Sequence, residues 1–428
     1  MSAVFRIISS LAVLSATAAY PSNTFPLHRR QSEITRRGFS KGSASLLSTQ
    51  LGEVVDVEVN LGGQSFLVEL DLGSSDLWVV GDGYKCIDPS TNGILPQSSC
   101  LYGNKTYSPS ETFFPIPNQN FGVFYGAGIA AGILGNDTVT FANISVPRQK
   151  VGIAQSTTNQ GDGVNSGLLG LAYPALTSAH PGTSIDNTTF LYNRIPYDPL
   201  LFNMANQGLI EPFFSLAIER TSFDEATGPG GLLSIGEIAP VPHSHEWAST
   251  PVVILPDIPI NVTANISQIS YWALEIQGVY YGNRQSPVKS NCTTEPANLD
   301  HLSKNDTSFN GILDNGNLLT FLPAAVAEAV NAQFSPPATL AEGTYTWSVP
   351  CNATAPAFGL EIARQIFWHD ARDMIINNGD GTCSSPIARA EDVTLDGFVG
   401  HFIGIQFFKN VLAVFDFGKD EIRLAART

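Results

Sequence analysis

The stretches FLVELDLG at residues 66–73 and FNGILDNG at residues 309–316 decide the fold, because they are two copies of one pattern. Each is a short apolar run that ends in Asp-x-Gly, with the aspartate at Asp71 in the first and at Asp314 in the second. One such ending is a weak signal, since aspartate and glycine are also what ordinary turns use. Two copies in the two halves of the chain predict a duplicated molecule whose halves bring the aspartates face to face.

A second element follows each aspartate at a similar distance. It is a pair of bulky apolar residues and a glycine, LLG at residues 168–170 and FIG at residues 402–404. From Gln50 to about Phe417 the chain consists of short apolar runs rich in Val, Ile and Phe, broken by Gly, Pro, Asn and Asp, which is typical of strands and turns. We therefore predict a mostly β fold of two lobes with a ligand-binding cleft between them.

Helices are expected to be few. The best candidates are residues 199–207, residues 323–334, which follow the second aspartate, and residues 359–367. No repeat of short period appears in the sequence, which argues against solenoids and propellers.

Composition excludes several classes of protein. The 428 residues are 43% hydrophobic and only 14% charged, which suits a large buried core and not disorder. The formal net charge is −16 and the basic residues form no stripe, so nucleic acid and anionic membranes are poor partners. An acidic surface also suits a protein that works at low pH.

The amino terminus predicts secretion. A largely apolar run from Ile7 to Tyr20, rich in small residues near its end, indicates a signal peptide over residues 1–19. The alternative is a membrane anchor, for which about 20 apolar residues are needed and this run is short. No apolar tail precedes Thr428, so we expect no carboxy-terminal anchor and an extracellular protein.

A short basic segment follows the apolar run. Residues 20–37 contain paired arginines at positions 29–30 and 36–37, which indicates a pro-segment with dibasic processing sites. We expect a zymogen that matures near Gly38.

Secretion makes the cysteines and the glycosylation motifs interpretable, because disulfides persist in oxidising compartments. We expect one local disulfide between Cys86 and Cys100 and another between Cys351 and Cys383. Cys292 is left over, as a buried thiol or as an intermolecular link. The density of glycosylation motifs predicts a glycoprotein. Nine sites match N-x-S/T, at Asn104, Asn136, Asn143, Asn187, Asn261, Asn265, Asn291, Asn305 and Asn352.

Two facing aspartates have a characteristic chemistry. Because two adjacent carboxylates do not both ionise easily, one keeps a proton while the other accepts one, and the pair serves as acid and base together. A carbohydrate-cleaving carboxylate pair is an alternative use of two aspartates. The sequence has no HExxH or comparable metal spacing, no G-x-S-x-G and no phosphate-binding loop, so we expect neither a metal nor a cofactor.

Further motifs carry a resemblance to a known family. DLGSSDLW at residues 71–78 is similar to the DTGSSNLW segment of the pepsin-like aspartic peptidases, and YGAG at residues 125–128 resembles the flap hairpin of that family. Other matches are GLLGLAYP at 167–174, YWALEI at 271–276, LLTFLP at 318–323 and FFKNVLAVFD at 407–416. Together they span roughly Gln50 to Ala425 and are similar to the fungal-type secreted acid proteases.

The resemblance implies a bilobal, pepsin-like double β-barrel with the active-site cleft between its lobes. The amino-terminal lobe would be residues 38–240, with Asp71 and the flap, and the carboxy-terminal lobe residues 241–428, with Asp314. It further implies protein or peptide substrates and a monomer. Peptide bonds would be hydrolysed at acidic pH by a water held between the two aspartates, without a covalent intermediate.

The flap would close over the substrate and exclude water. Tyr125 and Gly126 would lie at its tip and contact the substrate, with Trp78 packing beneath Tyr125. The alternative for Tyr125 is an ordinary cross-strand aromatic residue.

The supporting residues of the dyad depart from the family pattern. The residue after each aspartate is usually a threonine or serine that bonds across to the other lobe, whereas here it is Leu72, which has no donor, and Asn315, whose amide still donates. After the motif glycines Gly73 and Gly316, Ser74 keeps a second supporting hydroxyl. Its counterpart Asn317 is an amide that does not relay a proton.

These replacements leave two functions open. Loss of hydrogen bonds to the charged form should raise the carboxylate pKa values and slow turnover. The first hypothesis is an aspartic endopeptidase, and the alternative is a catalytically weak or inactive binding or inhibitory protein. Retention of both aspartates favours the enzyme.

Overall fold

The computed structural model describes residues 41–126, 128–158, 160–182, 193–256, 258, 268–283, 302–395 and 398–428. The predicted signal peptide and pro-segment, Cys292 and four of the acceptor asparagines (187, 261, 265 and 291) lie outside the described residues. Within them, no helix is long and apolar enough to cross a membrane.

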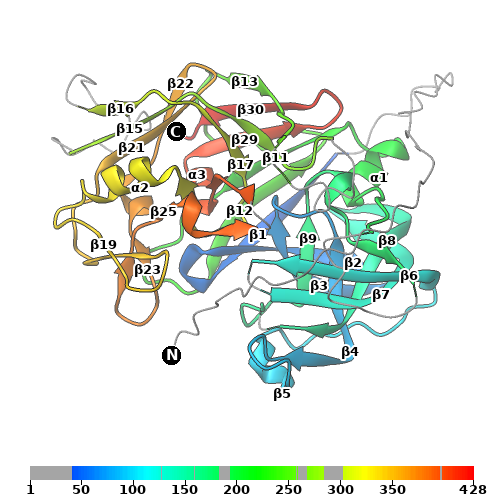
Figure 1. The fold of residues 1–428 in the computed structure, drawn as a ribbon. Coiled ribbons are helices and arrows are strands. Elements are labelled where there is room, and N and C mark those ends of the chain that lie inside the picture. Colours follow the sequence, from blue (N-terminus) through cyan, green and yellow to red (C-terminus); the bar gives the residue numbers. More distant parts are fainter. Residues whose placement is uncertain are drawn as a thin grey trace, which may run out of the picture.

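Fifteen strands form one large sheet that contains most of the first half of the chain (Figure 1). Its order is β10-β6-β7-β8-β4-β9-β3-β2-β1-β12-β11-β29-β30-β13, with β5 paired to β4. The strands are β1 (Gly42–Thr49), β2 (Val54–Leu61), β3 (Gln64–Asp71), β4 (Leu77–Ile87), β5 (Ile94–Leu95), β6 (Phe114–Tyr125), β7 (Gly128–Phe141), β8 (Ile144–Thr157), β9 (Gly167–Gly170), β10 (Ala179–Pro181), β11 (Phe213–Ile218), β12 (Gly228–Ile235), β13 (Ala248–Pro251), β29 (Val411–Asp416) and β30 (Glu421–Ala426).

The second half forms smaller sheets, ordered β14-β17-β28, β16-β15-β21-β22, β18-β25, β19-β20-β24-β23 and β26-β27. Their strands are β14 (Ala273–Ile276), β15 (Gly278–Gly282), β16 (Ser303–Asn305), β17 (Phe309–Leu313), β18 (Thr320–Leu322), β19 (Thr339–Leu340), β20 (Trp347–Val349), β21 (Ala357–Ile362), β22 (Gln365–Trp368), β23 (Ile376–Asn377), β24 (Cys383–Ser384), β25 (Ile387–Arg389), β26 (Thr394–Leu395), β27 (Phe398–Val399) and β28 (Phe402–Ile403). The α-helices are α1 (Leu200–Asn206), α2 (Ala324–Asn331) and α3 (Ile405–Phe408).

The duplicated plan is present in the strand pairing. β3 runs parallel to β9, with Asp71 beside Gly170, and β17 runs parallel to β28, with Leu313 beside Ile403. Backbone hydrogen bonds tie each aspartate to its partner element, at 2.8 Å from Leu171 N to Asp71 O and 3.1 Å from Asp314 N to Ile403 O. Each apolar pair followed by glycine therefore lies beside the strand that carries an aspartate.

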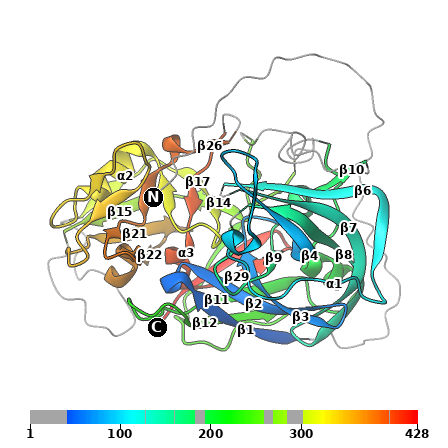
Figure 2. The ribbon, with the colours of Figure 1, turned by 90° about the horizontal axis from the view of Figure 1, so that it is seen from below.

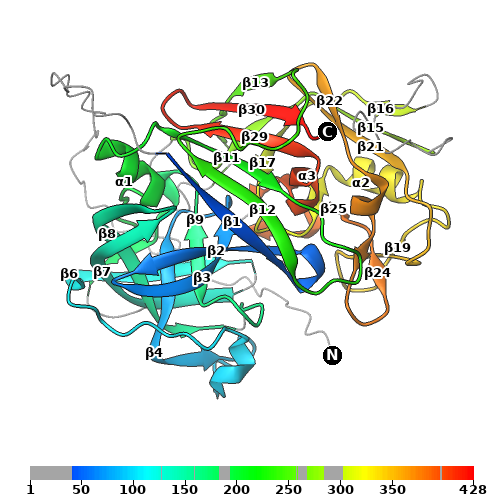
Figure 3. The ribbon, with the colours of Figure 1, turned by 180° about the vertical axis from the view of Figure 1, so that it is seen from behind.

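The two halves are joined by the end of the chain. β29 and β30 pair with each other, and β29 pairs with β11, so the last strands complete the sheet of the first half. From behind, β1, β12, β11, β29 and β30 lie side by side (Figure 3), and from below the two lobes lie on either side of β29 (Figure 2). The mostly β prediction is confirmed, while the lobe boundary at residues 240 and 241 stays a prediction.

Two of the three expected helices exist. α1 and α2 lie within residues 199–207 and 323–334. The helix expected at 359–367 is wrong: β21 and β22 form an antiparallel hairpin there. Ala363 and Arg364 at its turn have φ values of 49° and 66°, a left-handed pair that matches the twist of two-residue hairpins. A short buried apolar run is ambiguous between helix and strand by periodicity alone.

Both expected disulfides are present. Cys86 bonds Cys100 across 14 residues, and Cys351 bonds Cys383 across 32. The first closes a loop that begins on β4 and the second ties β24 to the segment before β21.

Candidate active site

The two Asp-x-Gly loops lie against one another. A Cβ atom added to Gly73 would lie 2.6 Å from Asp314 Oδ1, and one added to Gly316 would lie 2.5 Å from Asp71 Oδ1. Each glycine therefore touches the carboxylate of the other half. No larger residue fits at either place, and the two carboxylates are held side by side.

The hydrogen bonds to the two carboxylates are unequal. Asp71 accepts from Ser74 Oγ at 2.5 Å and from Gly73 N at 2.7 Å. Asp314 accepts from Gly316 N at 3.1 Å. Asn317 Oδ1 accepts from the backbone N–H of Leu319, and no hydrogen bond joins its side chain to the Asp314 carboxylate in the described structure. Ser74 therefore has no counterpart among the described residues whose side chain hydrogen-bonds the Asp314 carboxylate.

The unequal hydrogen bonding gives Asp71 and Asp314 different pKa values. Burial raises the pKa of Asp71, and the bonds from Ser74 and Gly73 oppose that rise. Burial also raises the pKa of Asp314, well above its ordinary value, and the negative charge of Asp71 raises it further. Asp71 is therefore the member that ionises first, and Asp314 is the one that keeps the shared proton.

Asn315 makes the bridge between the halves. Its Oδ1 accepts from the backbone N–H of Leu72 at 2.9 Å, and its Nδ2 donates to the carbonyl of Leu70 at 2.6 Å. The side chain is buried, with 1% of its surface exposed. An amide carries both a donor and an acceptor, so one residue bonds both backbone groups of the opposite loop.

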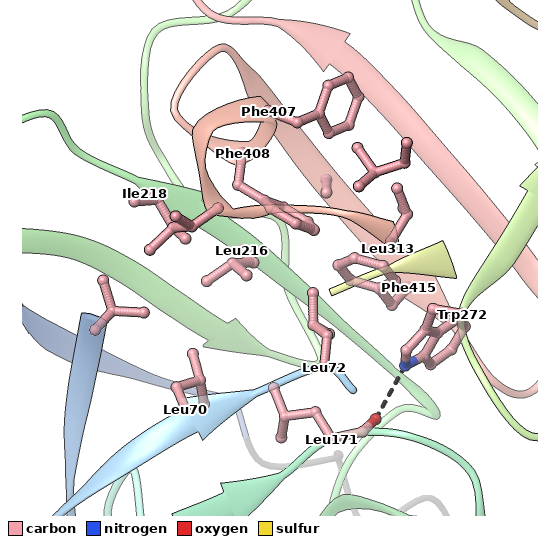
Figure 4. Packing of buried hydrophobic residues seen from close by; sticks show 14 of the residues in the cluster. Leu70, Leu72, Leu171, Leu216, Ile218, Trp272, Leu313, Phe407, Phe408 and Phe415 are labelled. Atoms are coloured by element: carbon pink, nitrogen blue, oxygen red, sulfur yellow. Dashed lines mark hydrogen bonds between the residues drawn. The ribbon is translucent and has the colours of Figure 1, made fainter. Parts of the chain in front are cut away.

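Leu72 contributes packing in place of a hydroxyl. Its side chain is fully buried and lies among Leu216 and Phe415, from the large sheet that joins the halves, and Trp272, which directly precedes β14 (Figure 4). Trp272 itself donates its indole N–H to the carbonyl of Leu171 at 2.9 Å, the bond drawn in the figure. The first loop is therefore fixed to the rest of the molecule through its apolar side chain.

The predicted flap is a hairpin formed by β6 and β7, with Tyr125 opposite Gly128 at its end. The Tyr125 hydroxyl accepts from the indole Nε1 of Trp78 on β4 at 2.8 Å. Burial raises the pKa of the Tyr125 phenol well above its ordinary value, and the charges of Asp76 and Asp71 add to the rise, so the phenol stays neutral. Gly126, the next residue, is exposed.

Asp76 lies within the same motif as Asp71, and the sequence predicted no role for it. Asp76 is fully buried, and its Oδ1 accepts from Tyr197 Oη at 2.5 Å and from Ser178 N at 2.9 Å. Burial raises its pKa, and the hydrogen bond from Tyr197 opposes the rise. It ties the loop after Asp71 to residues much later in the chain, a contact for which the sequence carries no signal.

In the part of the chain that the structure describes, no three His, Cys, Asp or Glu side chains are grouped to hold a metal ion.

Paired Asp-x-Gly loops between duplicated β lobes, one of which carries a flap hairpin, define the class of the aspartic peptidases. The chain belongs to the eukaryotic aspartyl protease family, whose model matches residues 54–427. This is a family of enzymes, and it confirms the resemblance seen in the sequence.

Individual relatives agree with that assignment. A protein of Aspergillus fumigatus that bears the name "probable aspartic-type endopeptidase" is 36% identical over 90% of this chain and 81% of its own length. Mouse (Mus musculus) gastricsin is 24% identical over 86% of this chain and 79% of its own. The crystal structure of an aspartic proteinase from Irpex lacteus matches with a TM-score of 0.64 at 19% identity, covering 91% of this chain and 98% of that one. The fold is therefore the bilobal fold of the pepsin-like aspartic proteinases.

Proposed function

We propose that this protein is an active endopeptidase that cleaves peptide bonds at acidic pH with Asp71 and Asp314. The observation that carries the proposal is the unequal hydrogen bonding of two adjacent carboxylates. Ser74 and Gly73 favour the charged form of Asp71, whereas the Asp314 carboxyl has one backbone donor and a raised pKa. One member is thus prepared as a base and the other as an acid over the same range of pH.

The proton movements follow from that division. Asp71 takes a proton from a water held between the carboxylates as the water oxygen attacks the substrate carbonyl carbon. Asp314 gives its proton to the carbonyl oxygen, so the intermediate carries no net oxyanion. Asp71 then gives its proton to the amide nitrogen and the C–N bond breaks. Asp314 takes a proton from one hydroxyl of the intermediate, so an amine and a carboxylic acid are released and the dyad returns to its starting state. Tyr125 and Gly126 on the flap would cover the substrate during these steps, with Trp78 supporting Tyr125.

One set of observations favours the second candidate, a binding or inhibitory protein of low activity. Leu72 has no hydroxyl, and Asn317 bonds its own loop and not Asp314. Against it, Asn315 bonds both backbone groups of the opposite loop, which holds the dyad together without the missing threonines.

A cleavage assay separates the two candidates. Purified mature protein is incubated with unfolded casein from pH 3 to pH 6, with and without pepstatin, beside the variant Asp71→Asn. We expect cleavage that pepstatin inhibits and that Asp71→Asn abolishes. Absence of pepstatin-sensitive cleavage across this range would sink the peptidase proposal and leave the binding protein.

We also propose that the protein is a secreted, monomeric glycoprotein made with a signal peptide and a pro-segment. Three of the acceptor asparagines, Asn104, Asn143 and Asn352, are exposed in the structure and accessible to glycosylation. Amino-terminal sequencing and the mass before and after enzymatic deglycosylation test the proposal. An unprocessed amino terminus or an unchanged mass would contradict the corresponding part.

A further inference from the structure

A carboxyl group outside the dyad lies close to it on the same strand. Glu69 is two residues before Asp71 on β3, and alternate residues of a strand point to the same face. Val68 and Leu70, which point the other way, are completely buried in the core, whereas Glu69 is partly exposed. Two strand residues span about 6–7 Å. Glu69 therefore lies on the dyad's face of the sheet, within reach of a substrate side chain near the cleaved bond.

Two more carboxyl groups surround Glu69. Asp56 on β2 is its direct cross-strand partner. Thr49 Oγ1 links Asp56 to Asp162, with distances of 3.3 Å to Asp56 Oδ2 and 2.5 Å to Asp162 Oδ2. Like charges directly opposite one another destabilise a sheet, so this arrangement favours either protonated carboxyls or a positive group that approaches them.

Two acceptors of this cluster lack donors, although Asp56 and Asp162 have theirs. Glu69 has no hydrogen bond and no ion pair within the described residues. Asn165, 99% buried, donates its Nδ2 to Asp56 Oδ1 at 3.4 Å and so points into the cluster, but its own Oδ1 has no partner. A buried amide oxygen without a donor costs free energy and indicates that a donor-bearing group completes the site.

The acidities agree with this geometry. Burial raises the pKa of Asp56 to about 8, and its contact with Asp162 adds to the rise. Burial likewise raises the pKa of Glu69 well above its ordinary value, and the charges of Asp71 and Asp56 raise it further. The fold thus gathers carboxyl groups that keep their protons beside the dyad, and a cation there would favour their ionised form.

We propose that Glu69, Asp56, Asp162 and the Asn165 carbonyl form a subsite that binds a lysine or arginine side chain of the peptide substrate. Lysine offers three donors and arginine five, and neither has an acceptor, which complements the unpaired acceptors of Glu69 and Asn165. The protein would then select peptides with a basic residue close to the cleaved bond. This inference rests on the proposed peptidase function, and it names the substrate class of that same active site.

The test compares peptides that differ at one position. A set of internally quenched peptides carries lysine, arginine, norleucine or glutamate at each position from four before to two after the cleaved bond. We expect kcat/KM at least tenfold higher for lysine or arginine than for norleucine at one of these positions. In Glu69→Gln the ratio should fall to about one. Glu58→Gln, which removes an exposed charge already bonded to Ser65 on the neighbouring strand, should keep the wild-type ratio.

Folding and cleavage are controlled separately. Asp162→Asn repeats the test at a partly exposed position in case Glu69→Gln does not fold, and thermal unfolding verifies both variants. Binding of the same lysine and norleucine peptides to Asp71→Asn tests the subsite without turnover, with tenfold tighter binding of the lysine peptide expected. Equal binding, or cleavage by the wild type with no basic preference at any position, overturns the subsite. No cleavage of any peptide contradicts the peptidase function and leaves the binding result to decide the subsite.

Discussion

Asn315 is the residue on which the dyad most depends for its geometry. Substitution by alanine leaves the buried N–H of Leu72 and carbonyl of Leu70 without partners, and each such group costs about 1–3 kcal/mol. We expect Asn315→Ala to lower the free energy of unfolding by about 2–4 kcal/mol and to lower kcat at least tenfold. Denaturant unfolding and steady-state kinetics measure the two effects.

Asn317→Ala is the matched control, because that amide makes a local bond to Leu319 alone among the described contacts. It should cost less than about 1 kcal/mol. Equal losses in both variants would show that the bridge between the halves has no special role.

Ser74 sets the acidity of Asp71. Its hydroxyl favours the charged carboxylate, so it lowers the pKa of Asp71 against the effect of burial. Ser74→Ala should therefore raise that pKa, and the acidic limb of the kcat/KM profile should move to higher pH by up to about one unit. Ser75→Ala, whose hydroxyl bonds the carbonyl of Tyr173, is the neighbouring control and should leave this limb in place. A limb that stays fixed in Ser74→Ala contradicts the assignment of Asp71 as the base.

At the scale of elements, the hydrogen bond from Trp78 to Tyr125 helps to hold the end of the hairpin of β6 and β7 in position. Tyr125→Phe removes the acceptor for the Trp78 indole N–H but keeps the aromatic ring. We expect kcat/KM to fall about tenfold, since a loosened flap covers the substrate less often, while thermal stability changes little.

The same strand supplies the control for that measurement. Phe124 is exposed, and its side chain points to the other side of the strand from Tyr125. Phe124→Leu should keep both stability and kcat/KM. A flap role for Tyr125 is contradicted if the two variants behave alike.

At the scale of the whole molecule, buried carboxyl groups make stability depend on pH. Burial raises the pKa of Asp56 to about 8 and that of Glu53 to about 7. In the unfolded chain both groups titrate near pH 4. Between these values the folded state binds more protons than the unfolded state, so the stabilising effect is complete below about pH 4 and is lost as pH rises to about 8.

We expect Tm to be highest in the acidic range and to fall by several degrees between pH 4.5 and pH 7.5. The net charge of −16 adds repulsion in the same direction. Asp56→Asn should flatten the decline, because it removes one titrating group while keeping an acceptor for Thr49. Scanning calorimetry of the wild type and of Asp56→Asn over this range measures the decline of Tm with pH. An equally steep decline in the variant would contradict the prediction.

Much of the fold was predictable because it depends on local patterns of the sequence. The short apolar runs that end in Asp71 and Asp314, and the repeated apolar pairs at 168–170 and 402–404, predicted a duplicated β protein, and the strand pairing confirms it. The run at 359–367 was mistaken for a helix because a short buried segment has no decisive periodicity.

The sequence by itself determined the family, the duplicated plan and the positions of the two aspartates, because each depends on residues that are close together along the chain. Only the tertiary structure decided what supports them. That Asn315 bonds both Leu70 and Leu72, and that Glu69 faces Asp56 and Asp162, depends on distances between residues that are far apart in the chain or on different strands. Residue types alone do not set such distances, since packing of the whole core does.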